Sequence, residues 1–226
     1  MYVAHIFQFI MKIFFRSFLG VLLLVVVVFI TGPTVDAPVI DKPLPELSIG
    51  LNDLPQWVQE QNEAFPNIKP GNESELIFAD SIPKKTAYAI VYLHGFSGST
   101  ADGAPVHKEI AKALGANIYF MRFKGHGRDG TALASATAGD WLEDAAEAIE
   151  IGRRIGEKVL VIATSMGGTI ATISASIPEL REGVMGYTLV SPLYGVNNPA
   201  ANLLSLPFAR QWIPLVAGET RSWEPD

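Results

Sequence analysis

The chain has 226 residues, with 17 Lys and Arg against 23 Asp and Glu, a formal net charge of −6 and no Cys. This length suits one domain of about 100–200 residues with an appendage. The absence of Cys excludes disulfides, thiolate nucleophiles and Cys-ligated metal sites. Residues 1–35 contain two basic residues and no acidic one, so the rest of the chain carries all 23 acidic residues. Such an acidic body repels phosphate backbones, and we expect no nucleic acid as partner.

An uncharged, apolar segment lies near the N-terminus. No residue from Ser17 to Val35 is charged, and the centre of this stretch reads LGVLLLVVVVFI. A helix needs about 20 apolar residues to cross a bilayer, because no water there satisfies its backbone. We therefore predict that residues 1–35 form a transmembrane anchor, with Lys12 and Arg16 on the cytoplasmic side and the body outside that membrane. In a bacterium, the anchor would lie in the inner membrane and the body in the periplasm.

A cleaved signal peptide is the alternative interpretation of this segment. The two basic residues would form its basic region, and Val35-Asp36-Ala37 resembles a cleavage signal of small residues. However, Pro38 would follow the cut, and the apolar run is longer than the usual core of about 7–15 residues. We therefore favour an uncleaved anchor and keep secretion after cleavage as the alternative.

Residues 36–70 precede the main body as a linker with a short helix. Prolines among polar residues between positions 32 and 48 indicate an extended linker. Residues 51–65 then show the pattern of a short amphipathic helix, with Asp53 as N-cap and Pro55 in the first turn.

Residues 71–195 alternate apolar runs with helical patterns. Residues 87–93 (AYAIVYL) form a continuous apolar run, typical of a strand buried on both faces. One helix is predicted to begin with a capping box between Thr137 and Asp140. The predicted strands are 76–79, 87–93, 116–122, 159–163 and 187–190, and the predicted helices are 102–114, 137–155 and 167–177. Strands that alternate with helices indicate an α/β fold, with a mostly parallel sheet and helices on both faces.

A candidate nucleophile lies between the predicted strand 159–163 and the helix that follows it. The stretch ATSMGG, in which Ser165 is the third residue, is close to the G-x-S-x-G pattern of a Ser on a sharp strand-to-helix turn. Small neighbours are needed because the backbone turns tightly; Gly167 fits the pattern, and Ala163 departs from it but is still small. Free N–H groups at the helix N-terminus favour the negative charge that develops in acyl transfer. A Ser that only caps the helix is the alternative.

A second loop supplies candidate donors for an oxyanion. The stretch His94-Gly95-Phe96-Ser-Gly follows the predicted strand 87–93. In acyl-transfer sites of this kind, one N–H comes from the residue after the nucleophile and the other from the loop after the third strand. The N–H groups of Met166 and Phe96 fit these two positions. Alone, this loop would be an ordinary connection with Gly for turning; together with the candidate nucleophile it indicates an acyl-transfer site.

These motifs resemble the α/β-hydrolase superfamily, and within it the monoacylglycerol lipase, carboxylesterase and serine-aminopeptidase-like branch. The matching pieces run in the order of that family and are His94-Gly95-Phe96, Gly125-His126-Gly127, Asp140-Trp141 and Ser165-Met166-Gly167-Gly168. The resemblance implies Ser165 as nucleophile and Phe96 and Met166 as oxyanion donors. It also implies that His94 orders the oxyanion loop and that His126 belongs to a turn. We expect His107 to be solvated on its helix.

The acid and the His of a catalytic triad have no candidates in this chain. In this fold their order is Ser, then Asp or Glu, then His, whereas the four His, at positions 5, 94, 107 and 126, all precede Ser165. The resemblance implies two further strands, which would carry the acid and the base. We therefore expect a truncated chain that ends within the start of a lid, residues 196–226, and that exposes an apolar sheet edge. A non-catalytic relative, or a base supplied by His126 or His94, is the alternative.

The function that follows is hydrolysis of carboxylic esters with lipid-like acyl groups through an acyl-Ser165 intermediate. Turnover by this chain should be low, because a Ser hydroxyl without an adjacent base is a poor nucleophile. Amide cleavage and a membrane-anchored binding module without activity are the alternatives. The expected partners are a small acyl ester and a membrane, and the oligomeric state stays open. No metal or organic cofactor is expected, because the His spacing suits no metal and no Gly-rich phosphate loop follows a strand.

Overall fold

The computed structural model describes residues 2–34 and 47–218. The described residues form two units: residues 47–194 are the body, and residues 2–34 with 195–218 are the second unit. The candidate cleavage signal Val35-Asp36-Ala37, Pro38 and much of the predicted linker lie outside the described residues.

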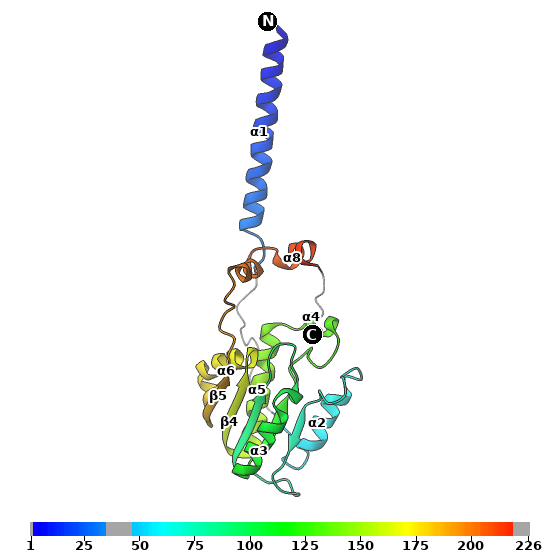
Figure 1. Ribbon diagram of the computed structural model, residues 1–226, viewed down its shortest axis with the longest axis vertical. Helices are drawn as coiled ribbons and strands as arrows, with labels where there is room; N and C mark the ends of the chain where they lie inside the picture. The colour runs from blue at the N-terminus through cyan, green and yellow to red at the C-terminus, as the bar shows by residue number, and fades with distance from the viewer. Residues whose placement is uncertain (1, 35–46, 219–226) are drawn as a thin grey trace. The chain divides into compact units, whose positions relative to one another are not determined.

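The body is built on a five-stranded sheet (Figure 1). Its strands are β1 (Glu75–Ile77), β2 (Thr86–Leu93), β3 (Asn117–Met121), β4 (Gly156–Thr164) and β5 (Val184–Val190). In space they follow the order β1-β3-β2-β4-β5. β1 runs antiparallel to β3, and the other neighbours are parallel. The prediction of a mostly parallel sheet in an α/β fold is therefore confirmed.

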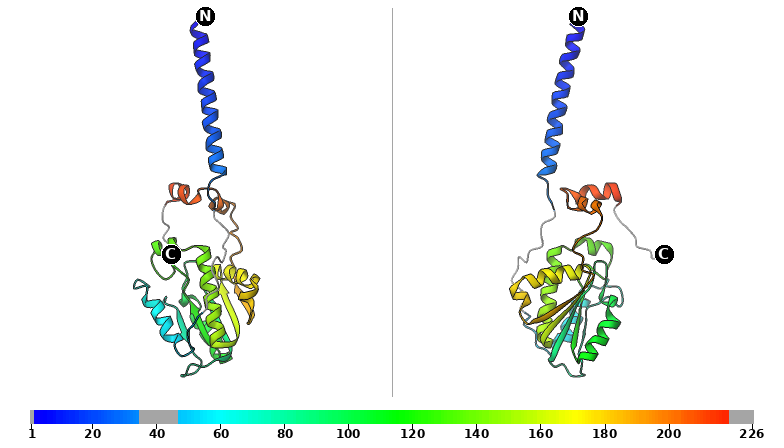
Figure 2. Two further views of the ribbon diagram at one scale, coloured as in Figure 1. Left: turned by 180° about the vertical axis from the view of Figure 1, so that it is seen from behind. Right: turned by 60° about the vertical axis from the view of Figure 1, so that its left-hand side comes forward.

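The helices of the body cover both faces of this sheet (Figure 2). They are α2 (Leu54–Glu63), α3 (Ala104–Leu114), α4 (Gly130–Ser135), α5 (Ala138–Ile155), α6 (Met166–Ser176), α7 (Pro178–Arg181) and the short 3-10 helix η1 (Thr100–Asp102). α5 and α6 pack on the face that carries Val91 and Val161. α3 packs on the opposite face against Ile90 and Phe120. Since all four of these strand residues are fully buried, the central strands lie in the core on both sides.

Two cap predictions had different outcomes. Thr137 and Asp140 form the predicted capping box at the start of α5: the Asp140 N–H donates to the Thr137 hydroxyl at 3.2 Å, and the Thr137 N–H donates to the Asp140 carboxylate at 2.8 Å. Asp53 occupies the N-cap position of α2, but its side chain accepts no capping hydrogen bond. The backbone of Asp53 is helical, with φ −92° and ψ −13°. A residue whose side chain caps a helix usually has an extended backbone instead.

The outer edge of β5 is open. Within the described residues β5 pairs with β4 alone, and Met185 and Val190 are 53% and 46% exposed. On the α3 side, a groove of about 470 Å³ runs between α3 and β5 and is lined largely by apolar side chains, among them Val106 and Leu160. This edge and groove agree with the exposed apolar edge expected from the sequence.

The second unit contains the long helix α1 (Tyr2–Ile30), the 3-10 helix η2 (Pro199–Ser205) and the helix α8 (Ala209–Ala217). Residues 6–30 of α1 contain an 18-residue stretch with a mean hydropathy of 2.8 and are long and apolar enough to cross a membrane. Their side chains are not buried within the protein. Within the described residues this is the one helix that meets both criteria.

Candidate active site

Ser165 lies at a sharp turn between β4, which ends at Thr164, and α6, which begins at Met166. Its backbone has φ +51° and ψ −116°, a conformation that costs about 1–3 kcal/mol in a residue with a side chain. Two hydrogen bonds hold the turn: the Ser165 N–H donates to the Val190 carbonyl at 2.9 Å, and the Leu193 N–H donates to the Ser165 carbonyl at 3.0 Å. The end of β5 and the segment after it therefore stabilise the strained residue. The residue is half-buried and so remains accessible.

Close packing around Ser165 depends on two glycines. A Cβ atom on Gly167 would lie 2.2 Å from the carbonyl oxygen of Leu93 and 2.5 Å from that of His94. A Cβ atom on Gly95 would lie 3.2 Å from the Ser165 Cβ and 3.8 Å from its Oγ. Thus Gly95 lies directly beside the Ser165 side chain, and α6 begins against the backbone at the end of β2. The loop after β2 and the turn after β4 meet at this point.

The two candidate oxyanion donors belong to these two segments. Met166 is the first residue of α6, and the N–H of a first helical residue has no acceptor within its own helix. Phe96 directly follows Gly95, and its N–H donates to no acceptor among the described residues. Two such N–H groups beside a Ser hydroxyl are the arrangement that stabilises the oxyanion of acyl transfer.

His94 holds the loop that carries Phe96. Its ring is fully buried, with Nδ1 2.8 Å from the Gly95 carbonyl oxygen and Nε2 3.1 Å from the Phe123 nitrogen. Because the Phe123 N–H donates to Nε2, the proton of the neutral ring sits on Nδ1 and is donated to Gly95. Burial lowers the pKa of His94 to about 3. Both nitrogens of a neutral ring are therefore engaged, and neither is free to act as a base for Ser165.

His126 lies in an aromatic cluster next to this loop. Its ring centroid is 4.9 Å from that of His94, 5.4 Å from that of Trp141 and 5.9 Å from that of Phe96. Its Nδ1 lies 3.3 Å from the Lys124 carbonyl oxygen, and its buried Nε2 has no partner among the described residues. Burial lowers the pKa of His126, so its neutral form is favoured. The ring thus forms part of the wall behind Phe96.

His107 corrects one expectation from the sequence. We expected it to be solvated, but it is only 7% exposed. Its ring lies 4.3 Å from the ring of Tyr92 on β2, and its Nδ1 contacts the Gly103 carbonyl oxygen one turn earlier. The reason is the packing of α3, which turns the face containing His107 towards the sheet. His107 is therefore part of the core on the face opposite α5 and α6.

The Ser165 hydroxyl has no base or acid as partner among the described residues. The hydrogen bonds of His94 and His126 are made to backbone groups instead. The described residues also contain no group of three or more His, Asp or Glu that would suit a metal ion. The site described here thus comprises a candidate nucleophile and two candidate backbone donors. Sequence reasoning missed the contributions of Phe123, Val190 and Leu193, because each acts through a backbone group that no side-chain pattern reveals.

Comparisons with known proteins concern the family and the fold of the chain. Residues 84–222 match the sequence model of the family described as serine aminopeptidase, S33 (Hydrolase_4). No curated protein sequence was matched. A structure reported with the metagenome-derived lipolytic enzymes LipS and LipT is 23% identical, with a TM-score of 0.53 over 61% of this chain and 52% of that one. Est1E from Butyrivibrio proteoclasticus, with ferulic acid bound, is 19% identical, with a TM-score of 0.51 over 68% of this chain and 61% of that one. The chain therefore spans less than two thirds of either structure, and these two likenesses concern the fold.

Replacement of Gly167 tests the contact between α6 and the end of β2. We expect Gly167→Ala to lower the free energy of unfolding by about 1–3 kcal/mol, because the new methyl group overlaps two fixed carbonyl oxygens. Gly130→Ala is the matched control, since a Cβ at this helical position has nothing within 4 Å. The control should be neutral or stabilising by up to about 1 kcal/mol. Urea denaturation of the detergent-solubilised chain measures both, and equal effects would contradict the proposed contact.

Replacement of His94 tests the neutral buried ring. We expect His94→Gln to destabilise the protein by about 1–3 kcal/mol near neutral pH, because the backbone groups of Gly95 and Phe123 lose a partner. The folded pKa of about 3 lies below the ordinary 6.5, so the stability due to the neutral ring is fully present above pH 6.5 and is lost as the pH falls towards 3. The difference between the two proteins should therefore shrink on acidification. Urea denaturation at a series of pH values measures it, and a pH-independent difference would refute the assignment.

Proposed function

Because the chain belongs to the serine aminopeptidase S33 family of α/β hydrolases, we propose that Ser165 is the nucleophile of a serine esterase site. The observation that carries the proposal is the strained backbone of Ser165, with Gly95 directly beside its side chain. Strain of this kind persists where the surrounding structure holds it, and it concentrates at functional sites. A Ser that only capped α6 would need no positive φ, and the Ser165 side chain accepts no capping hydrogen bond.

The proposed reaction is acyl transfer to Ser165 followed by hydrolysis. Oγ attacks the ester carbonyl carbon, and its proton passes to solvent water, since the described residues supply no base for it. The carbonyl oxygen becomes an oxyanion, which the N–H groups of Phe96 and Met166 stabilise. When the tetrahedral intermediate collapses, the C–O bond to the alcohol breaks and the alcohol leaves with a proton. Water then attacks the acyl-Ser165 ester by the same route, which releases the carboxylic acid and restores the hydroxyl.

The proposed substrates are carboxylic esters with an apolar acyl group. Phe96 is 55% exposed and packs edge-on against His126 and Trp141, so an apolar surface adjoins the candidate oxyanion hole. The two similar structures, one reported with lipolytic enzymes and one of Est1E with ferulic acid bound, support this substrate class. The family description favours amide cleavage as a second candidate. Parallel assays with a p-nitrophenyl acyl ester and an aminoacyl p-nitroanilide distinguish the two.

The described residues supply no base for Ser165, and we propose that the activity of this chain is accordingly low. In serine hydrolases from which a triad member is removed, the oxyanion hole and substrate binding still accelerate the reaction by about 10³–10⁴-fold over water. We expect ester hydrolysis by this chain to lie in that range. The idle binding module remains the alternative, and it predicts no acceleration.

Labelling with a fluorophosphonate probe tests the nucleophile. We expect slow labelling that Ser165→Ala abolishes and that the control Ser176→Ala, at the exposed end of α6, leaves unchanged. Added imidazole should raise the labelling rate, because it supplies the base that Ser165 lacks. In-gel fluorescence over time measures the rate. Labelling that survives Ser165→Ala would refute Ser165 as the nucleophile. Fast labelling without imidazole would show that a base is present.

We also propose that α1 is retained as a membrane anchor. Its apolar surface supports this, and so does its length of 29 residues, since about 20 suffice to span a bilayer. We expect the full-length mass of the membrane-bound protein to be preserved in the native host. Intact-protein mass spectrometry of the membrane and soluble fractions measures it. A soluble form that begins at Pro38 would establish the cleaved alternative instead.

A further inference from the structure

Apolar side chains are also exposed in the second unit, outside α1. Residues 195–218, here called the η2–α8 segment, contain a single charged residue, Arg210. Its most exposed apolar side chains are Leu215, Val216 and Val196, with exposures of 86%, 80% and 61%. This segment carries little charge and exposes several large apolar side chains. Such a combination indicates an interaction surface.

The helix α8 is amphipathic. At helical spacing, Trp212, Leu215 and Val216 fall on one side and Arg210 falls on the other, while Gln211 lies at the edge of the apolar side, next to Leu215. The Trp212 indole N–H donates to the Pro207 carbonyl at 3.1 Å, which orients its ring beside the start of the helix. An apolar face with Trp, opposite a face that carries a basic residue, is typical of a helix that lies in a membrane interface.

Phe208 connects this segment to the end of α1. Its N–H donates to the Pro33 carbonyl at 3.0 Å. Its ring lies against Gly32, where a Cβ would be 2.0 Å from it. The ring also lines a shallow apolar hollow with Val28 and Phe29 of α1. The segment is therefore attached at the C-terminal end of the apolar helix by both backbone and side-chain contacts.

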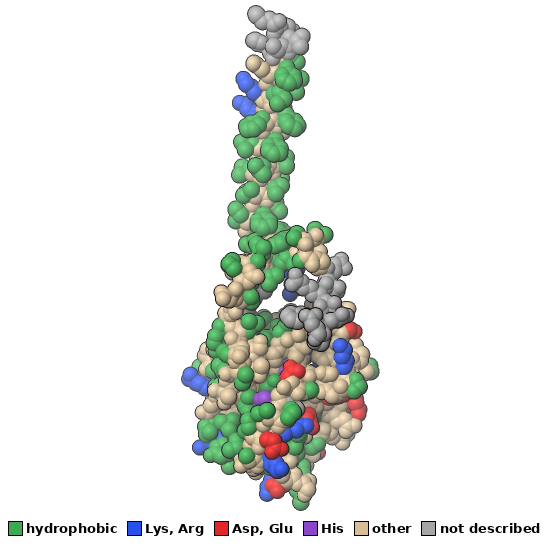
Figure 3. All heavy atoms as spheres, in the orientation of Figure 1, with side chains coloured by type: hydrophobic (Ala, Val, Ile, Leu, Met, Phe, Trp, Pro, Cys, Tyr) green, Lys and Arg blue, Asp and Glu red, His purple; other side chains and the backbone are tan. Residues whose placement is uncertain are grey.

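The geometry points to a lipid bilayer as the partner of the η2–α8 segment: its apolar face lies in the interface of the same membrane that α1 spans. This inference rests on the proposed anchoring by α1. With Lys12 and Arg16 at the cytoplasmic surface, residues 17–30 of α1 cover about 21 Å as a helix, so the C-terminal end of α1 lies in the far half of an apolar core about 30 Å thick. Figure 3 shows hydrophobic side chains along α1, with the basic ones near its N-terminal end. Val28 and Phe29 then approach the opposite boundary of the apolar core, and Phe208 is beside them.

This placement accounts for the composition of the segment. Leu215 and Val216 would enter the acyl chains, Trp212 would lie at headgroup level, and Arg210 would face the lipid phosphates. A lid over an acyl pocket, the role expected from the sequence, would cover the same apolar side chains with protein instead of lipid. Leu215 is surrounded by lipid in the first placement and by protein in the second. A fluorescent label at this position distinguishes the two.

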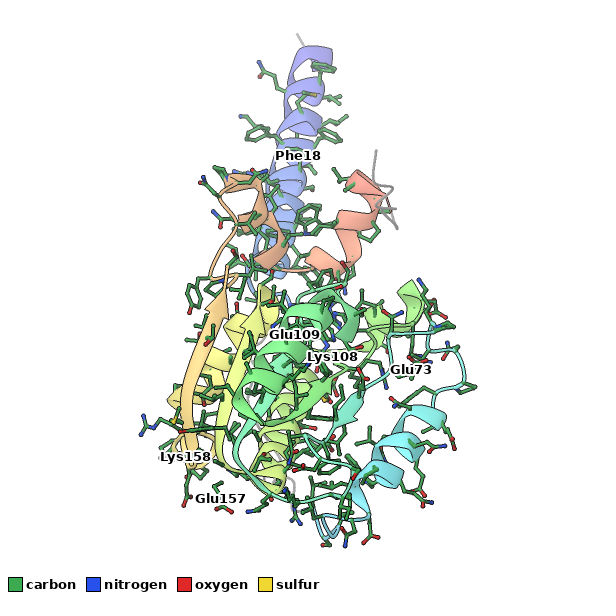
Figure 4. The ribbon with its side chains drawn as sticks, turned by 60° about the horizontal axis from the view of Figure 1, so that its bottom comes forward. Phe18, Glu73, Lys108, Glu109, Glu157 and Lys158 are labelled. Atoms are coloured by element: carbon green, nitrogen blue, oxygen red, sulfur yellow. The ribbon has the colours of Figure 1, made fainter. Side chains whose placement is uncertain are left out.

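Because the chain has no native Cys, one introduced Cys carries the only fluorescent label in each variant. We would attach an environment-sensitive NBD group to Leu215→Cys, Phe18→Cys and Lys158→Cys in the full chain, reconstituted in phosphatidylcholine vesicles. Figure 4 shows Phe18 on α1 and Lys158 at the start of β4; all three side chains are exposed, so labelling disturbs no packing. Quenchers are lipids with a nitroxide near the headgroup, lipids with a nitroxide near the chain end, and aqueous iodide.

We expect the label at Leu215→Cys to be quenched more by the shallow than by the deep nitroxide, and about 3-fold less by iodide than the label at Lys158→Cys. The label at Phe18→Cys should be quenched by the lipid nitroxides and protected from iodide. If the Leu215→Cys label behaves like the Lys158→Cys label while the Phe18→Cys label is quenched by the nitroxide lipids, the interfacial placement of the η2–α8 segment is wrong. The same result would support anchoring by α1. Protection from iodide without lipid quenching means that protein covers the segment, which also overturns the inference. If Phe18→Cys is open to iodide, the anchor itself fails, and the inference fails with it.

Discussion

The close approach of two backbone segments is the constraint on which the rest of the site depends. β2 and β4 are parallel neighbours, and Leu93 and Ala163 pair at their carboxyl ends. The loop after one strand and the turn after the other must therefore share a small volume. Gly95 and Gly167 make this possible, because a methyl group at Gly167 would meet the carbonyl oxygens at the end of β2. The candidate nucleophile and its candidate donors are thus positioned by main-chain packing, which is rigid.

Buried polar groups keep this arrangement in place. The ring of His94 links the Gly95 carbonyl to the Phe123 N–H across the ends of β2 and β3. A neutral ring can donate and accept at once, whereas a charged one could only donate and would be costly to bury. Burial therefore does more than lower the pKa of His94: it selects the one protonation state in which the ring can bridge the two segments. The histidine is a positioning residue for the loop that carries Phe96.

The sequence predicted the central strands and the turn at Ser165 because each depends on local signals. An uninterrupted apolar run indicates a strand buried on both faces, and small residues around a Ser after such a run indicate a sharp turn. The direction of β1 depends on which strand it meets, and the helices α4 and α7, of six and four residues, are too short for periodicity to reveal. His107 shows the same limit, since a His on a helix is solvated or buried according to tertiary packing. The hydrogen bonds from Phe123 and Leu193 involve backbone atoms, which carry no signature in the residue type.

The open edge of β5 affects how firmly the turn at Ser165 is held. Val190 ends β5, and its carbonyl accepts the hydrogen bond from the Ser165 N–H. An edge strand supported on one side frays more readily than a central one. Fraying of β5 from this end would release the restraint on Ser165 and let its backbone relax to an ordinary conformation. The conformation of Ser165 and the solvent exchange of the β5 amides would then be coupled, and any polypeptide that added a strand to this edge would restrain the candidate nucleophile from a distance.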